Sequence, residues 1–341
     1  MPQIKTPFLW FTQLINGKPK PWDYFEIDGV MVNAYEILRK NHANTIAKKG
    51  IHNYLNFKGP IMMDSGGFLF MKKNILEVHP KTILELYERS KPDFGVILDH
   101  PIQPNLPRNE RKKRQRKTLE NTRYMVTLQK GKNPMLIPVI HGYSLQTVSW
   151  FIDQLNKIGD FEIYGIGSLV PSVFNTKDAG GIYNVVKIVS FVRKRLPDKK
   201  LHVFGVGSSL TMHLMFYIGA DSVDSSGWRT KAAYGAIQLP GMADRYITKR
   251  KKHKDYPKLN KEERKILNNC DCPACKRNSV DSLMQSFQLR ALHNAWVFQN
   301  EVKLARELIE DNTYDKYVER ILQKTPFNHV FQYAKKLKTG K

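Results

Sequence analysis

Short apolar runs alternate with longer amphipathic stretches through the middle of the chain. Each run ends in a polar or glycine-rich tip, and the runs cover 59–64, 94–99, 135–141, 162–167, 201–207 and 220–224. Near-continuous apolar runs are typical of strands that are buried on both faces, as in a parallel sheet. Helical patterns between them cover 82–91, 109–129, 145–158, 182–195 and 209–218. The alternation predicts a series of βαβ units.

The number of these units separates two α/β architectures. Further strands near 29–32 and 235–239 bring the count close to eight, the number in a TIM (β/α)8 barrel. An open doubly wound sheet is the alternative, but its site lies at a single switch point, whereas here every strand ends in a polar tip. The pattern therefore favours the barrel, with an active site at the carboxyl ends of its strands.

Charge adds a constraint on the partner. The 341 residues include 55 Lys and Arg against 31 Asp and Glu, a net charge of +24, and 41% are hydrophobic, which excludes a disordered tail. Such an excess favours a polyanion, with nucleic acid ahead of a membrane surface. No 18-residue apolar stretch and no secretory cleavage pattern occur, so we expect a cytoplasmic protein (in the host cytoplasm, if viral) without a membrane partner. Basic runs at 111–117 and 248–267 are either solvated faces or phosphate contacts.

All three cysteines lie within six residues, as Cys270, Cys272 and Cys275. The C-x-C-x-x-C spacing is typical of a tetrahedral metal site, and the best candidate for a fourth ligand is His293. The alternatives are three unrelated buried thiols and an ordinary core histidine. Four protein ligands would make a zinc ion structural. We therefore expect a barrel over 1–245, a basic segment with an inserted zinc-binding subdomain over 246–294, and C-terminal helices over 295–341 that pack back on the barrel.

Acidic residues stand at three predicted strand tips, Asp64, Asp99 and Asp224. In a barrel, Asp64 and Asp224 would face each other, and carboxylates about 5 Å apart suit a retaining displacement at an anomeric carbon. Each is equally compatible with a helix cap. Two glycines after Asp64 would let the backbone approach a planar ligand that stacks on Phe68. An aromatic and two cations that suit nucleic acid follow Asp224, namely Trp228, Arg229 and Lys231.

Taken together, these motifs resemble the tRNA-guanine transglycosylase superfamily. The shared features, in family order from about Gly59 to Asn294, are DSGGF at 64–68, Asp99, His141-Gly142, Gly167-Ser168-Leu169, FGVG at 204–207, Asp224 and the cysteine motif with His293. The resemblance implies a TIM barrel with a zinc subdomain. It also implies exchange of guanine in a nucleic acid for a free 7-deazaguanine base.

The resemblance also implies a role for each matching residue. Asp224 would be the nucleophile that attacks the ribosyl C1′, Asp64 the general acid/base, and Asp99 the acid that reads the N1 and N2 edge of the base. The other base-binding positions would be Phe68, His141, Gly167, Ser168 and Phe204. The zinc ligands would be Cys270, Cys272, Cys275 and His293.

Several departures from the family bear on the nucleic acid. Leu69 and His141 stand where glutamine is usual, and 225–235 replaces a Pro-Thr-Arg-type loop. With 341 residues, we also expect no room for the RNA-binding tail domain of archaeal members. These departures favour the DNA-guanine transglycosylase branch, which places preQ0-type bases in DNA and, on a duplex, leaves room for partner proteins that open it. The alternatives are a tRNA-guanine transglycosylase and a catalytically silent nucleic-acid-binding subunit.

Overall fold

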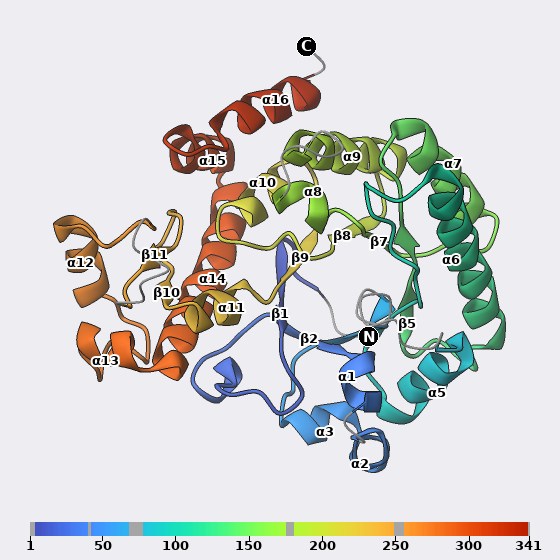
Figure 1. Ribbon diagram of the computed structural model, residues 1–341, viewed down its shortest axis with the longest axis horizontal. Helices are drawn as coiled ribbons and strands as arrows, with labels where there is room; N and C mark the ends of the chain where they lie inside the picture. Colours follow the sequence, from blue (N-terminus) through green and yellow to red (C-terminus); the bar gives the residue numbers. More distant parts are fainter. Residues whose placement is uncertain (1–3, 40–41, 68–77, 175–180, 249–255, 340–341) are drawn as a thin grey trace.

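A ring of parallel strands surrounded by helices forms the centre of the molecule (Figure 1). The computed structural model describes every residue except 1–3, 40–41, 68–77, 175–180, 249–255 and 340–341. The strands of the ring are β1 (Phe8–Thr12), β2 (Gly29–Asn33), β3 (Ile61–Asp64), β4 (Phe94–Val96), β5 (Met135–Ile137), β6 (Val139–Ile140), β7 (Ile163–Ile166), β8 (Lys200–Val203) and β9 (Ser222–Ser225). They follow the order β5-β4-β3-β2-β1-β9-β8-β7-β6.

The two ends of this order are halves of one strand. Only Pro138 separates β5 from β6, and a proline has no backbone N–H for the ladder. β5 pairs with β4 on one side and β6 pairs with β7 on the other, both parallel. The segment from 135 to 140 therefore closes the ring at eight positions, and the predicted TIM barrel is confirmed.

One strand expected in the barrel belongs to another sheet, and one barrel strand was missed. Residues 235–239 contribute only β10 (Ala236–Ile237), which pairs antiparallel with β11 (Arg245–Tyr246) in a separate two-stranded sheet. The missing barrel strand is β1, which pairs with both β2 and β9. The residues described before it contain no helix, so it lies outside the strand-helix rhythm. Its role depends on β9, which is far away in the sequence.

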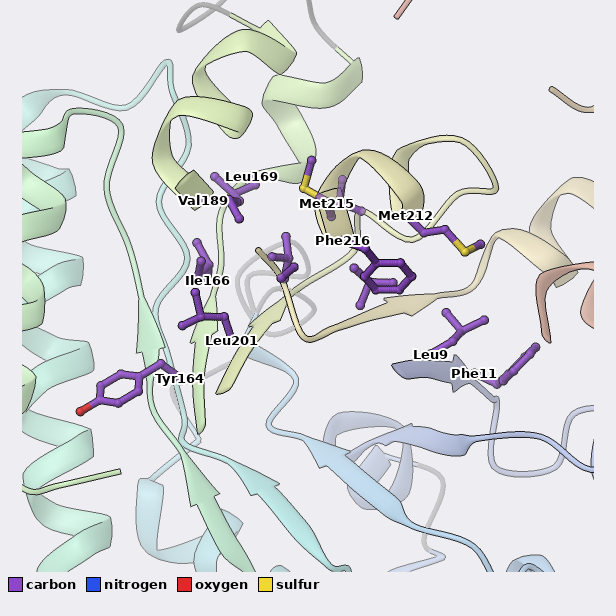
Figure 2. Close-up of a cluster of buried hydrophobic side chains, with 14 of the residues drawn as sticks. Leu9, Phe11, Tyr164, Ile166, Leu169, Val189, Leu201, Met212, Met215 and Phe216 are labelled. Atoms are coloured by element: carbon purple, nitrogen blue, oxygen red, sulfur yellow. The ribbon is translucent and has the colours of Figure 1, made fainter. Parts of the chain in front are cut away.

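Alternation along the strands produces two apolar layers. On β1, Phe8 and Trp10 face the lumen, while Leu9 and Phe11 face the helices. The lumen is filled by Ile4, Phe8, Trp10, Met31, Met62, Phe94, Val96, Ile137, Val139 and Ile163. Figure 2 shows part of the outer layer, with labelled side chains from β1, β7 and β8 and from the helices α9 (Gly181–Arg195) and α10 (Thr211–Tyr217). Because the lumen is packed, chemistry is confined to the carboxyl ends of the strands.

Helices cover the outside of the ring. After the 3-10 turn η1 (Pro21–Asp23), they are α1 (Ala34–Arg39), α2 (Ala43–Lys49), α3 (Ile51–Leu55), α5 (Pro80–Ser90), α6 (Arg108–Leu128), α7 (Leu145–Asn156), α8 (Val170–Phe174), α9 (Gly181–Arg195), α10 (Thr211–Tyr217) and α11 (Gly227–Ala233). Side-chain capping sets local starts. At the start of α7, for example, the Ser144 hydroxyl accepts a hydrogen bond from the Thr147 amide at 3.3 Å. None of the described helices combines the length and apolarity needed to cross a membrane.

The C-terminal third adds a small subdomain beside the barrel. It contains α12 (Lys261–Asn268) and α13 (Val280–Gln285) and has its own apolar core. Helix α14 (Phe287–Glu310) runs without a break through the expected boundary at 294 and packs on α11 and β1. α15 (Tyr314–Gln323) and α16 (Asn328–Thr339) then pack on α10 and α9. A single helix thus belongs to both the subdomain and the barrel wall.

Candidate active site and metal centre

A cavity of about 230 Å³ opens at the carboxyl ends of the barrel strands. Most of its polar lining was expected from sequence. The predicted site residues that line it are Asp64, Asp99, Gly167, Ser168, Phe204 and Asp224. They follow strands that are distributed around the ring and lie far apart in the sequence. Barrel closure is what brings them together.

Asp224, at the end of β9, is buried and held by three neighbours. The Gly205 amide donates to its Oδ1 at 2.6 Å, and the Thr12 hydroxyl donates to its Oδ2 at 3.3 Å. His202 Nε2 lies 3.4 Å from Oδ1, and its Nδ1 is 2.9 Å from the Ser222 hydroxyl. Sequence reasoning missed Thr12 and His202. A polar residue inside the apolar run at 201–207 was the available signal for His202.

Asp64, at the end of β3, is held beside the other two acids. Asn33 Nδ2 donates to its Oδ2 at 2.5 Å, and the Gly66 amide donates to the same oxygen at 3.3 Å. Burial, followed by the negative charges of Asp99 and Asp224, raises the pKa of Asp64 to about 7. A carboxyl group that titrates near neutral pH can both give and take a proton at the reacting centre.

The two glycines after Asp64 are required by the local packing of the chain. Gly66 has φ +84°, a conformation that favours glycine, and a Cβ on Gly67 would lie 2.4 Å from the Asp99 backbone oxygen. Ser65 Oγ donates to Asp99 Oδ1 at 3.3 Å. The glycines therefore let the end of β3 pack against the Asp99 backbone.

His141 lies behind the cavity wall, so its predicted contact with the base is wrong. Its side chain is fully buried, with Nδ1 2.9 Å from the Ser168 hydroxyl and Nε2 3.0 Å from Asp99 Oδ2. Ser168 itself has φ +66°, and its Oγ accepts from the Ile102 amide at 2.9 Å. Both ring nitrogens of His141 thus face protein groups, and the imidazole orients Asp99.

Of the two phenylalanines expected to bind the base, only Phe204 lies in the described part of the chain. Phe204 lines the cavity, and its ring packs edge-on against His202 with centroids 4.3 Å apart. Phe68 and Leu69 lie outside the described residues.

The three residues expected to contact nucleic acid after Asp224 differ in their surroundings. Trp228 has no exposed surface, and its ring packs edge-on against Phe11. That prediction is wrong, because the turn into α11 directs the indole into the core. Arg229 is partly exposed, with its guanidinium 5.1 Å from the Phe287 ring, and Lys231 pairs with Asp244 at 3.0 Å. These two cations remain at the surface.

The three cysteines and His293 gather around one point. Their ligand atoms all lie within 4.8 Å of one another, and His293 Nδ1 is 3.6, 3.5 and 3.4 Å from the sulfur atoms of Cys270, Cys272 and Cys275. Zinc binds thiolate at about 2.3 Å and imidazole at about 2.0 Å, so two such donors at the tetrahedral angle are about 3.5 Å apart. The observed spacing fits, and the four residues can hold a zinc ion.

The other side of His293 is fixed by the segment that follows β10. Its Nε2 lies 2.7 Å from the Gln238 carbonyl oxygen, and the Gln238 amide donates to Asn294 Oδ1 at 2.7 Å. The contact with the carbonyl oxygen orients the ring so that Nδ1 faces the sulfur atoms. With four protein donors and no open position, a zinc ion here would stabilise structure rather than activate water.

Comparisons with known proteins agree on one family. A family model described as queuine tRNA-ribosyltransferase matches residues 3–326. The chain is 30% identical to a tRNA-guanine(15) transglycosylase of Methanococcus aeolicus over 301 residues, which cover 85% of this chain and 43% of the relative. The enzyme of the same name from Pyrococcus furiosus is 28% identical over 325 residues, which cover 91% of this chain and 51% of that relative. The chain thus spans about half the length of the curated relatives it matches.

The burial of Trp228 predicts a stability effect. Trp228→Ala should lower the free energy of unfolding by about 3–5 kcal/mol, because it leaves a cavity between α11 and β1. The matched control is Trp150→Ala, at a side chain that is 41% exposed. The control should change the free energy of unfolding by less than about 1 kcal/mol. Thermal melting of both variants measures this, and equal losses would place Trp228 outside the core.

The cysteine cluster predicts one zinc ion per chain. Elemental analysis of protein purified without chelators should find it, and Cys272→Ser should lose both the metal and much of the thermal stability, because metal binding is coupled to folding. Asp271→Asn is the control, since this exposed carboxylate lies between two ligands and pairs with Lys276. Metal-free protein of unchanged stability would refute the site.

The raised pKa of Asp64 predicts a pH-dependent stability. Between its ordinary pKa near 3.8 and about 7, the folded protein holds a proton that the unfolded chain has lost. Stability therefore falls as pH rises through this window. Asp64→Asn removes the titration, so its melting temperature relative to wild type should rise by several degrees between about pH 4 and about pH 8. A constant difference would show that Asp64 titrates normally.

Proposed function

This chain belongs to the queuine tRNA-ribosyltransferase family, and we propose that it replaces guanine in tRNA with a free 7-deazaguanine base. The observation that carries the proposal is the pair of carboxylates, Asp64 and Asp224, at the mouth of one cavity in a parallel barrel. tRNA is preferred because the relatives named above are tRNA-guanine(15) transglycosylases. The net charge of +24 also suits a polyanionic substrate.

The first displacement would form a covalent intermediate on Asp224. An oxygen of its carboxylate attacks the ribosyl C1′, the C1′–N9 bond breaks, and the electron pair stays on the guanine N9. The proton that neutralises the leaving base comes from the carboxyl group of Asp64. Hydrogen bonds from Gly205 and Thr12 hold the attacking carboxylate in place.

The second displacement would reverse these roles with a new base. The Asp64 carboxylate takes the N9 proton of the incoming 7-deazaguanine, whose N9 then attacks C1′ as the bond to Asp224 breaks. Asp64 ends protonated, as it began, so protons and charges balance over the cycle. Two inversions retain the configuration at C1′. A pKa near 7 suits a group that must alternate between both forms.

Base selection would fall to Asp99. Its carboxylate lines the cavity and is oriented by Ser65 and His141. It can accept hydrogen bonds from the N1–H and 2-amino groups that guanine and preQ0-type bases share. Adenine lacks this pair of donors, and a buried charged acceptor left unpaired costs more than about 1–3 kcal/mol. Phe204 offers the base a stacking surface.

DNA is the second candidate, because of the segment after Asp224. In place of the Pro-Thr-Arg-type loop typical of the tRNA enzymes, this chain has residues 225–235, most of which form α11 with Trp228 buried beneath it. This segment would lie beside the nucleic-acid backbone, and its difference from the tRNA enzymes is compatible with a DNA backbone. Base exchange into DNA would need the target base out of the stack.

Incorporation of labelled guanine into tRNA, single-stranded DNA and duplex DNA tests the proposal. Wild type should label tRNA, while Asp224→Asn should lose all measurable exchange and still bind tRNA. Asp64→Asn should lose about 10²–10⁴-fold, the usual contribution of acid/base catalysis. Labelling of DNA alone would favour the second candidate, and no labelling of any substrate would favour a silent binding subunit.

A further inference from the structure

A second, larger cavity lies between α6 and α7, next to the active site. Its volume is about 820 Å³. It is lined by Ile102, Pro104, Arg108, Arg111, Lys112, Gln115, Arg116, Tyr143, Ser144, Gln146, Thr147 and Trp150, which we call the α6–α7 groove. Nothing in the proposed chemistry uses it.

One face of α6 supplies all the positive charge of the groove lining. Arg108, Arg111, Lys112 and Arg116 line the groove, and they follow the three- and four-residue spacing that places side chains on one side of a helix. The helix therefore places only some residues of the basic run at 111–117 in the groove. Lys113, although exposed, does not line the groove.

Within the described part of the chain, these four cations have no acidic partners. The groove lining contains no aspartate or glutamate, and no carboxylate of a described residue forms an ion pair with any of the four. Their neighbour Arg114 shows the contrast, because it pairs with Glu110 at 3.0 Å and also donates to the Pro101 carbonyl oxygen. Uncompensated cations that converge on a concave surface attract anions.

Aromatic rings complete the lining. Trp150 on α7 is 41% exposed, unlike the fully buried Trp228. Arg111 lies over the Tyr143 ring, with its guanidinium carbon 6.0 Å from the centroid. Cations beside exposed aromatic rings are the equipment with which proteins bind single-stranded nucleic acid, phosphates on the cations and bases on the rings.

The groove adjoins the active site. Ile102 lines both cavities. The Tyr143 hydroxyl donates to the backbone oxygens of Ile102 at 2.8 Å and Ser168 at 3.0 Å, and Ser168 lines the base cavity. A strand whose target nucleotide enters the active site would therefore have the groove beside its neighbouring nucleotides.

We propose that the α6–α7 groove binds the strand next to the exchanged nucleotide, with its phosphates on Arg108, Arg111, Lys112 and Arg116 and an unpaired base on Trp150. This proposal rests on the proposed function for the identity of the strand. The binding surface is a defined face of α6, and the remaining positive residues of the same helix do not take part.

Two double variants with the same loss of charge test the groove. Lys112→Gln with Arg116→Gln removes two groove cations. The matched control, Lys113→Gln with Arg123→Gln, removes two exposed cations of the same helix that do not line the groove. Binding of unmodified tRNA is measured by fluorescence anisotropy between about 50 and about 200 mM salt. The groove variant should flatten the slope of log affinity against log salt by about 1.4–1.8, while the control leaves it nearly unchanged.

Variants of Trp150 distinguish the contribution of base stacking from that of charge. Trp150→Ala should weaken tRNA binding about 5- to 100-fold without changing the salt slope, and Trp150→Phe should restore most of the affinity. Equal salt slopes for the two double variants, or unchanged tRNA affinity in Trp150→Ala, would overturn the proposal that the groove binds the strand. Because these measurements need no turnover, they stand apart from the exchange assay, whose failure would overturn the proposed function alone.

Discussion

Hydrogen bonding of β1 to β2 on one side and to β9 on the other is the constraint on which the rest of the structure depends. Without β1 the parallel strands would form an open sheet whose edges carry unpaired backbone groups. With it, the strand ends that carry Asp64 and Asp224 meet at one mouth. The same pairing places Thr12 beside Asp224, so closure supplies a hydrogen bond to the carboxylate as well as its position.

Burying three carboxyl groups in one cavity is unfavourable for folding, because like charges repel one another. The surroundings of the three groups differ in how they offset this repulsion. Asp224 receives hydrogen bonds from Gly205 and Thr12, and Asp99 lies against His141 and Ser65. At Asp64, burial and the charges of the other two carboxylates raise the pKa to about 7. Two neighbouring carboxyl groups with different surroundings are thereby suited to different roles in displacement chemistry.

Helix α14 connects the cysteine cluster to the barrel. His293 faces the cysteines with one nitrogen and the Gln238 carbonyl oxygen with the other. Further along the same helix, Glu301 accepts from Tyr317 at 2.6 Å and contacts His213 of α10 at 2.7 Å. The cysteine subdomain, the barrel wall and the C-terminal helices therefore share one element, so a metal ion held by the four candidate ligands would stabilise more than the cysteine subdomain.

The sequence by itself determined the strand-helix rhythm, the acids at the strand tips and the cysteine cluster, because each depends on local apolar patterning or on the chemistry of residues close together in the chain. Only the tertiary structure decided the rest. β1 became a barrel strand by pairing with β9, which is far away in the sequence, and Trp228 became core because α11 turns it toward Phe11. His141 lies behind Asp99 because both its ring nitrogens meet protein groups. Such outcomes depend on which distant segment packs against a residue, and no local pattern records that.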